Sequence, residues 1–264
     1  MTDLRIWHHG LMARWWAEFE HGGDDVAFFE NVIRTHGEPA LDAGCGTGRL
    51  LLPCLRAGLD VDGADASADM LDECRRIAGS ENLSVSLHAQ PMHALELPRK
   101  YATIVVCGAF GLGGTRADDL EGLRRLHDHL LPGGRLVMDH YLPNVGSQRG
   151  WRAWIQRPEL PRPWPETGQR KRAADGSEFE LLTRQKAFDP LEQTTVLEMQ
   201  VSHFVDDEVV ASETQEIAIN VYFKNEIELM LASAGFDEIR VTGGLEQRAA
   251  EPWKDQRIVF RARR

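Results

Sequence analysis

The sequence predicts an α/β fold in which an open, parallel sheet carries helices on both faces and is interrupted by an antiparallel β meander. Two patterns indicate this fold. From residue 40 to residue 141, short buried-strand patterns alternate with helical patterns, which is typical of parallel β-α-β units. After residue 141 the alternation stops, and three strand patterns follow one another without helices between them. Consecutive strands joined by short turns favour antiparallel pairing.

The elements follow in a clear order along the chain. Residues 11–19 and 24–36 have the apolar periodicity of amphipathic helices. In the alternating part, strands are expected at 40–43, 59–64, 83–87, 101–107 and 135–139, with helices at 47–57, 67–77 and 118–131. Residues 143–176 are rich in Pro, Gly, Arg and Trp and are expected to be irregular. The meander strands are expected at 179–188, 194–205 and 209–223, followed by a helix at 224–234 and strands at 235–241 and 257–262.

Composition limits the classes of function. The chain has 264 residues and a formal net charge of −11, which argues against binding to nucleic acid or to an anionic membrane surface. No apolar run reaches the roughly 18 residues of a membrane-spanning helix, and the first residues lack the apolar core of a signal peptide. Cys45, Cys54, Cys74 and Cys107 form no C-x-x-C pair. We therefore expect no metal site, reduced thiols and a cytoplasmic location.

A glycine-rich turn is the most informative motif. Residues 42–48 read Asp-Ala-Gly-Cys-Gly-Thr-Gly, directly after the first predicted strand and before a helix. Glycines allow a ligand to approach the backbone, and a helix start offers free N–H groups. The dinucleotide pattern G-x-G-x-x-G requires glycine where this chain has Arg49, and no Lys-Ser or Lys-Thr completes a phosphate loop. A purely structural turn is the alternative.

Asp65 strengthens the case for a ligand site. It lies 21 residues after Gly44, at the end of the second predicted strand. A carboxylate at this place can accept hydrogen bonds from ribose hydroxyls. The alternative is that Asp65 only caps the helix that begins after Ser67.

These motifs together resemble the class I S-adenosylmethionine-dependent methyltransferases. The resemblance rests on residues 42–48, on Gly63-Ala64-Asp65-Ala66-Ser67 with Met70-Leu71, on residues 131–136 and on Ala234-Gly235-Phe236. It implies a Rossmann-like, seven-stranded sheet whose last strand is antiparallel, with S-adenosylmethionine as cofactor over the carboxyl ends of the first strands. It further implies that the glycine turn faces the methionine part and that Asp65 binds the ribose.

The resemblance also implies a set of cofactor-binding residues. An acidic residue often faces the adenine amino group in this family, but Pro91 stands at its place, so Gln90 is the candidate acceptor and Met92 a candidate for packing on the base. The glycine-rich segment 107–114 is expected to border the transferable methyl group. The full set is Asp42, Gly44, Cys45, Gly46, Gly48, Asp65, Ala66, Met70, Gln90, Met92, Cys107 and Phe110.

The remaining residues are assigned to catalysis and substrate. His140, with Tyr141 beside it, follows the fifth strand at the carboxyl edge and is the candidate base, and a structural histidine is the alternative. Trp15, Trp16 and Tyr222 are candidates for substrate binding. Trp151, Trp154 and Trp164 would either join them in an apolar wall or bury the insert against the sheet.

The sequence thus predicts a cofactor-binding methyltransferase domain made of residues 1–142 and 224–264, with residues 143–223 inserted as a substrate lid or as the contact of a homodimer. The expected activity is methyl transfer to a nitrogen or oxygen of a small molecule, in natural-product metabolism. The insert resembles that of glycine and amino-sugar N-methyltransferases. A non-catalytic cofactor-binding module and a nicotinamide-dependent oxidoreductase are the alternatives.

Overall fold

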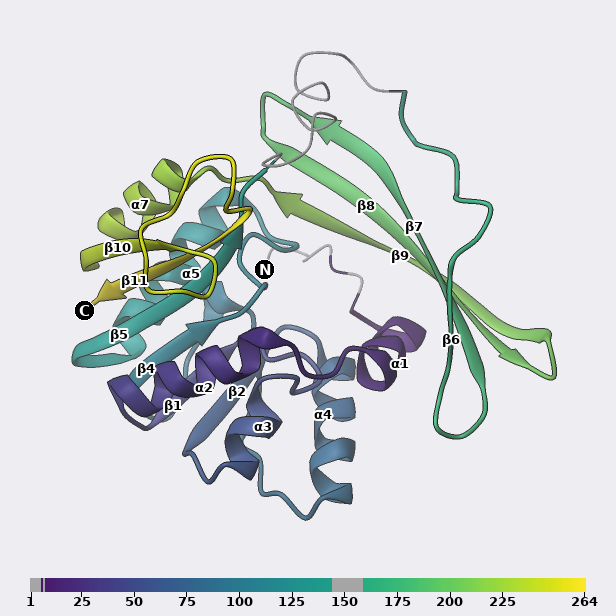
Figure 1. Ribbon diagram of the computed structural model, residues 1–264, viewed down its shortest axis with the longest axis horizontal. Coiled ribbons are helices and arrows are strands. Elements are labelled where there is room, and N and C mark those ends of the chain that lie inside the picture. The colour runs from purple at the N-terminus through teal and green to yellow at the C-terminus, as the bar shows by residue number, and fades with distance from the viewer. Residues whose placement is uncertain (1–5, 7, 144–158) are drawn as a thin grey trace.

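The computed structural model describes residues 6, 8–143 and 159–264, which form a seven-stranded sheet and a separate four-stranded sheet (Figure 1). The order of the larger sheet is β10-β11-β5-β4-β1-β2-β3. Strands β5, β4, β1, β2 and β3 pair in parallel, and β11 pairs antiparallel with both β5 and β10. The predicted fold class, with an antiparallel last strand and an antiparallel insert, is confirmed.

The elements alternate as the sequence predicts. Helices α1 (Gly10–Phe19) and α2 (Asp24–His36) precede the sheet. The alternating part consists of β1 (Ala40–Ala43), α3 (Leu51–Arg56), β2 (Val61–Asp65), α4 (Ala68–Ser80), β3 (Leu87–Ala89), the 3-10 turn η1 (Met92–Ala94), β4 (Tyr101–Val106), α5 (Arg116–His129) and β5 (Leu130–Tyr141). The meander consists of β6 (Gln169–Arg172), β7 (Glu178–Asp189), β8 (Thr194–Val205) and β9 (Glu208–Asn220), and α7 (Lys224–Ser233), β10 (Asp237–Gly243) and β11 (Arg257–Arg263) follow.

Alternating side chains bury both faces of the larger sheet. On β4, Ile104 and Val106 pack in the core under α5 and α7, whereas Val105 packs in the core under α2, α3 and α4. Successive side chains of a strand point to opposite faces, so apolar residues at consecutive positions require helices on both sides. In the part of the chain that the structure describes, no helix is long and apolar enough to cross a membrane.

The four-stranded sheet has its own core, which it shares with α1. Met12 and Trp15 of the helix are buried against Phe179, Val201 and Ile217 of the sheet. The meander therefore depends on the N-terminal helix to cover its apolar face.

Three element boundaries differ from the sequence predictions. Strand β6 lies in the stretch expected to be irregular; its residues Gln-Arg-Lys-Arg are polar and largely exposed, so they carry no alternation to detect. Helix α3 begins at Leu51 rather than residue 47, because Gly46 and Gly48 have φ angles of 54° and 89°, which no right-handed helix contains. Strand β3 is displaced toward the carboxyl side because its pairing with β2 begins only at Leu87.

Candidate functional site

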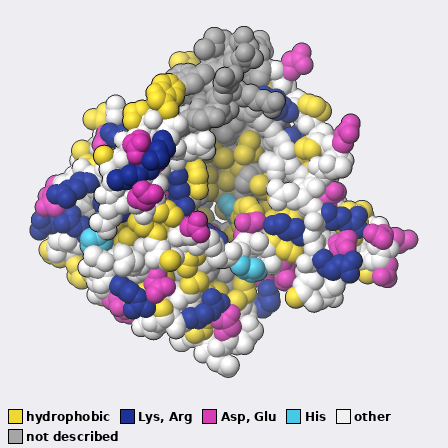
Figure 2. Space-filling view, in the orientation of Figure 1, with side chains coloured by type: hydrophobic (Ala, Val, Ile, Leu, Met, Phe, Trp, Pro, Cys, Tyr) yellow, Lys and Arg dark blue, Asp and Glu magenta, His cyan; other side chains and the backbone are white. Residues whose placement is uncertain are grey.

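A cavity of about 440 Å³ opens at the carboxyl ends of β1, β2 and β4. Its lining includes the glycine turn and the segment after β4, and also Ile217 and Ile219 of β9 in the other sheet. In Figure 2 the surface is hollowed between the two sheets, with hydrophobic side chains inside the hollow. The cavity is thus built by both halves of the fold, at the edge where open α/β sheets bind ligands.

The glycine turn forms the wall closest to the segment after β4. Gly44 has a φ of 85°, and a Cβ built on it would overlap the Cβ of Ala109. The amide of Gly44 donates to the carbonyl of Ala64 at 2.7 Å, which ties the turn to β2. Glycine is therefore needed at Gly44 both for its backbone conformation and for the close approach of the two segments.

Asp65 binds the turn as well as the following helix. Its Oδ2 accepts from the amide of Gly46 at 2.9 Å, and its Oδ1 accepts from the amide of Ser67 at 2.8 Å. Burial raises the pKa of Asp65, although the backbone donors act in the opposite direction. Ser67 itself caps α4 by accepting from the amide of Met70. Asp65 lines the cavity, so the ribose role stays a proposal alongside this structural one.

Asp42 lies directly behind the turn and has an unused acceptor. The side chain is only 2% exposed, and Oδ2 has no hydrogen-bond partner among the described residues. Burial raises the pKa of Asp42 to about 7. The residue does not itself line the cavity.

The segment after β3 supplies another part of the lining, where Gln90, Pro91 and Met92 lie. The Gln90 side chain is already used, since its Oε1 accepts from the amide of Glu96 at 2.7 Å and its Nε2 donates to the carbonyl of Glu96 at 3.3 Å. An adenine amino group bonding to Gln90 would therefore have to share or replace these bonds.

Most of the predicted cofactor-binding residues lie together in the cavity. Asp42 and Gly48 belong to the glycine turn but do not line the cavity. Burial raises the pKa of Cys107, so its sulfur is a thiol, and it donates to Asp25 Oδ2 at 3.3 Å. The predicted residues in the lining are Gly44, Cys45, Gly46, Asp65, Ala66, Met70, Gln90, Met92, Cys107 and Phe110.

The candidate catalytic residues lie outside the lining. The Nε2 of His140 donates to the carbonyl oxygen of Tyr222 at 2.9 Å, and burial lowers the pKa of the ring, so it is a neutral imidazole. Tyr141 is 59% exposed, beside Arg257. This geometry favours the structural alternative for His140, and the base role stays a hypothesis.

The three candidate substrate residues do not lie together. Trp16 lines the cavity, whereas Trp15 is fully buried in the core under the meander. Tyr222 is buried behind Phe110, with ring centroids 5.5 Å apart. Trp164 lies under Arg184, away from the cavity, and Trp151 and Trp154 lie outside the described residues.

Sequence reasoning missed an acidic and apolar region of the cavity. Asp118 and Asp119, which were expected only as a helix start, line it together with Ile217 and Ile219. Oδ2 of Asp119 accepts from the hydroxyl of Tyr222 and from Nδ2 of Asn220, each at 2.7 Å. Burial raises the pKa of Asp119 despite these donors. The only local signal was a pair of carboxylates one turn after the glycine-rich segment.

Within residues 6, 8–143 and 159–264, no three His, Cys, Asp or Glu side chains lie close enough together to bind a metal ion. The four cysteines are all free, three of them buried.

Comparison with known proteins gives two findings. A family described as "Methyltransferase domain" matches residues 40–134, which is the stretch that carries the glycine turn, Asp65 and the segment after β4. A search of curated proteins finds no match.

Solved structures share the fold over nearly the whole chain. The CcbJ methyltransferase from Streptomyces caelestis has a TM-score of 0.70 and 20% identity, covering 96% of this chain and 95% of its own. The sugar N-methyltransferase KedS8 from Streptoalloteichus has a TM-score of 0.68 and 17% identity, covering 100% and 94%. CalS10 from Micromonospora echinaspora, an amino pentose methyltransferase with S-adenosylmethionine bound, has a TM-score of 0.60 and 21% identity, covering 91% and 90%.

Proposed function

We propose that the chain is a class I S-adenosylmethionine-dependent methyltransferase, that S-adenosylmethionine is its cofactor, and that it methylates a nitrogen or oxygen of a small molecule. The observation that carries the proposal is that residues of both sheets line the same cavity. The methyltransferase domain contributes the glycine turn and Asp65, and the inserted sheet contributes Ile217 and Ile219. A concave, largely apolar cavity with a few polar groups suits a small molecule better than a polymer.

The residues present fit the cofactor. The backbone of Gly44, Cys45 and Gly46 lines the cavity, the half-buried carboxylate of Asp65 has lone pairs left beyond its amide donors, and Met70 and Met92 offer apolar surface. The glycine turn and Asp65 would hold the amino-acid and ribose parts. When bound, the cofactor supplies an activated methyl group.

The chain itself has to align the acceptor and exclude water. Phe110 and Leu112 with the two isoleucines of β9 provide apolar walls, and the carboxylates of Asp118 and Asp119 provide hydrogen-bond acceptors. Alignment of a nucleophile accounts for much of the rate in such transfers. KedS8 and CalS10 are described as acting on a sugar nitrogen and on an amino pentose, and this supports an acceptor of similar size, such as a sugar or amine of natural-product metabolism.

The domain division belongs to the same proposal: residues 1–142 and 224–264 bind the cofactor, and residues 143–223 cover the acceptor. We also propose a cytoplasmic location, supported by the free cysteines. A homodimer formed through the edges of the four-stranded sheet is the competing role for the insert. Light scattering of the purified protein distinguishes a monomer from a dimer.

The test is a turnover screen. The protein is incubated with S-adenosylmethionine and a panel of amines, amino sugars and phenols, and formation of S-adenosylhomocysteine and of a methylated product is followed by mass spectrometry. We expect turnover with at least one class of compound. Tight cofactor binding without turnover on any member of a broad panel would favour the non-catalytic module instead.

A further inference from the structure

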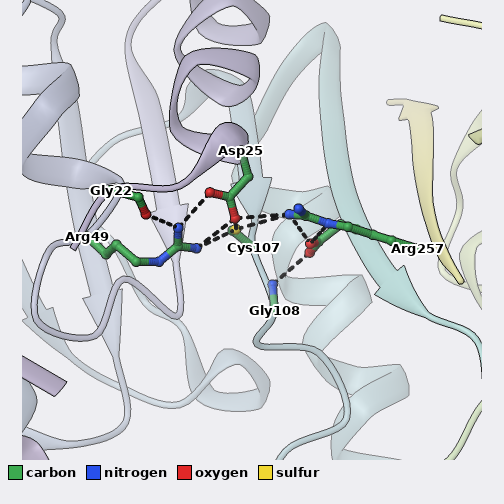
Figure 3. Close-up of polar contacts among 7 residues, drawn as sticks. Gly22, Asp25, Arg49, Cys107, Gly108 and Arg257 are labelled. Atoms are coloured by element: carbon green, nitrogen blue, oxygen red, sulfur yellow. Dashed lines mark hydrogen bonds and ion pairs between the residues drawn. The ribbon is translucent and has the colours of Figure 1, made fainter. Parts of the chain in front are cut away.

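Behind the cavity, four charged side chains from distant parts of the chain form one connected group (Figure 3). They are Asp25 at the start of α2, Arg49 of the glycine turn, Asp139 of β5 and Arg257 of β11. We call them the charge quartet. Two are acidic and two are basic, so the quartet is neutral as a whole, and Asp139 is only 1% exposed.

The quartet is anchored to the glycine turn through Arg49. Its guanidinium binds Asp25 in a bidentate manner, with Nη1 to Oδ1 at 2.6 Å and Nη2 to Oδ2 at 2.9 Å, and Nη1 also donates to the carbonyl of Gly22 at 2.9 Å. Burial alone would raise the pKa of Asp25, but the hydrogen bonds and charge of Arg49 bring it to about 2. Asp25 is therefore an anion throughout the physiological range.

The quartet is anchored to the segment after β4, residues 107–110, through Asp139. Its Oδ1 accepts from the amide of Gly108 at 2.7 Å, directly after β4. The neighbouring Cys107 accepts from Nη2 of Arg49 at 3.1 Å and donates to Asp25. Arg49, Cys107 and Gly108 line the cavity, whereas Asp25, Asp139 and Arg257 do not.

Arg257 joins the two acidic members of the quartet, in addition to the direct contact of Arg49 with Cys107. Its Nε donates to Oδ2 of Asp139 at 2.8 Å, and its Nη2 donates to Oδ2 of Asp25 at 3.0 Å. Without Arg257, the buried Asp139 would lose its ion-pair partner and would face Asp25, whose charge Arg49 still compensates. A buried carboxylate that loses its partner is strongly destabilising, which favours displacement of the wall that holds it.

We propose that Arg257 is a positioning residue for the cofactor cavity. By holding Asp25 and Asp139 together it adds to the contact between Arg49 and Cys107, and so helps to fix the separation between the glycine turn and residues 107–110. These two segments meet where Gly44 approaches Ala109. The fit at that point leaves no space for a methyl group, so a small displacement of either wall changes the shape of the site. The inference does not depend on which acceptor is methylated.

The test compares two arginines of the same strand. Arg257→Gln removes the bridge, whereas the control Arg261→Gln removes a half-buried arginine that donates to Thr242 and lies over Phe28, outside the cavity lining. Binding of S-adenosylhomocysteine is measured by calorimetry, and the amide resonance of Gly108 is followed by NMR together with its hydrogen exchange.

We expect Arg257→Gln to weaken S-adenosylhomocysteine binding by about tenfold or more, because displaced walls lose contacts with the ligand and a loss of about 1.4 kcal/mol is a tenfold change in affinity. The Gly108 amide should shift and exchange faster. Arg261→Gln should lower the melting temperature yet keep the affinity within about twofold and leave Gly108 unchanged. Equal affinity in wild type and Arg257→Gln, or equal weakening in both variants, would overturn the proposal.

A second variant covers the case in which Arg257→Gln does not fold. Arg257→Lys keeps the charge but lacks the planar fork that reaches both carboxylates. We expect an intermediate affinity, about threefold weaker than wild type, with a shifted Gly108 amide. Wild-type affinity together with a wild-type Gly108 resonance in Arg257→Lys would reject the positioning role. Failure to find an acceptor, by contrast, would affect only the proposed function, because these measurements use the cofactor product alone.

Discussion

Replacement of Asp65 by alanine tests the central contact of the cofactor site. The carboxylate accepts from the amides of Gly46 and Ser67 and lines the cavity, so its removal should affect both the turn and the ligand. Hydrogen bonds to a charged group contribute about 1.5–3 kcal/mol each when a ligand is bound. Loss of a ribose contact of this kind corresponds to about ten- to a hundredfold weaker binding of S-adenosylmethionine and S-adenosylhomocysteine.

The effect of Asp65→Ala on stability should be smaller than its effect on binding. Two amide donors lose their acceptor, which costs about 1–3 kcal/mol, but removal of a half-buried carboxylate also removes part of its desolvation penalty. We therefore expect a decrease of about 1–2 kcal/mol in the free energy of unfolding, measured by urea denaturation. Asp65→Asn should be intermediate in binding, since its amide keeps one oxygen acceptor.

The matched control is Asp72→Ala, a carboxylate on the exposed side of α4 that pairs with Arg75 at 2.6 Å. Exposed ion pairs contribute little, so both affinity and stability should stay close to wild type. Calorimetry that shows unchanged affinity in a folded Asp65→Ala protein would refute the assignment of Asp65 to the ribose. Equal losses in Asp65→Ala and Asp72→Ala would show that the effect is not specific to the site.

Four further outcomes are expected. Gly44→Ala should weaken S-adenosylhomocysteine binding by at least about tenfold, because the new methyl group overlaps Ala109 and φ is 85°; unchanged affinity by calorimetry would contradict the tight contact. Burial raises the pKa of Asp42 to about 7, so between about pH 4 and pH 7 the folded protein keeps a proton that the unfolded chain has released. The contribution of this proton to stability is complete below about pH 4 and is lost as the pH rises to 7. The free energy of unfolding, measured by urea denaturation across this window, should therefore depend less on pH in Asp42→Asn than in wild type. His140→Ala should lose about tenfold or less in turnover, since its Nε2 is bonded to a backbone carbonyl; a loss of about 10²–10⁴ with a changed pH profile would restore the base role. Ile219→Ala should raise the KM of the acceptor by about tenfold and leave the affinity for S-adenosylhomocysteine within about twofold, and the reverse pattern would remove β9 from the substrate region.

The parts of the fold that the sequence predicted are those whose signals are local. Buried apolar strands, glycine at the turn after β1 and the Ser67 cap of α4 are each readable within a few residues. Strand β6 was missed because its exposed polar residues follow no pattern, and its place is decided by pairing with β7. The start of α3 was wrong because the φ angles of the glycines are set by the turn.

The same distinction applies to the site. Gly44 and Asp65 were predictable because motif and spacing along the chain identify them. Arg49 was noticed only as a departure from a dinucleotide pattern, since its partner Asp25 is 24 residues away. The bond between Tyr222 and Asp119 spans 103 residues, and no periodicity in either segment indicates it. Side chains that meet only after the sheet has assembled cannot be paired from a local sequence pattern.

The placement of β11 has a consequence for synthesis of the chain. It lies between β5 and β10 and pairs with β5 along seven residues, from Arg257 opposite Tyr141 to Arg263 opposite Arg135. Those partners are made more than a hundred residues apart, and translation adds roughly 5–20 residues per second. For several seconds or more the ribosome therefore carries a nascent chain whose β5 has an open edge. During that interval the edge can pair with foreign strands, so expression yield should respond to chaperone supply more strongly than the stability of the finished protein would indicate.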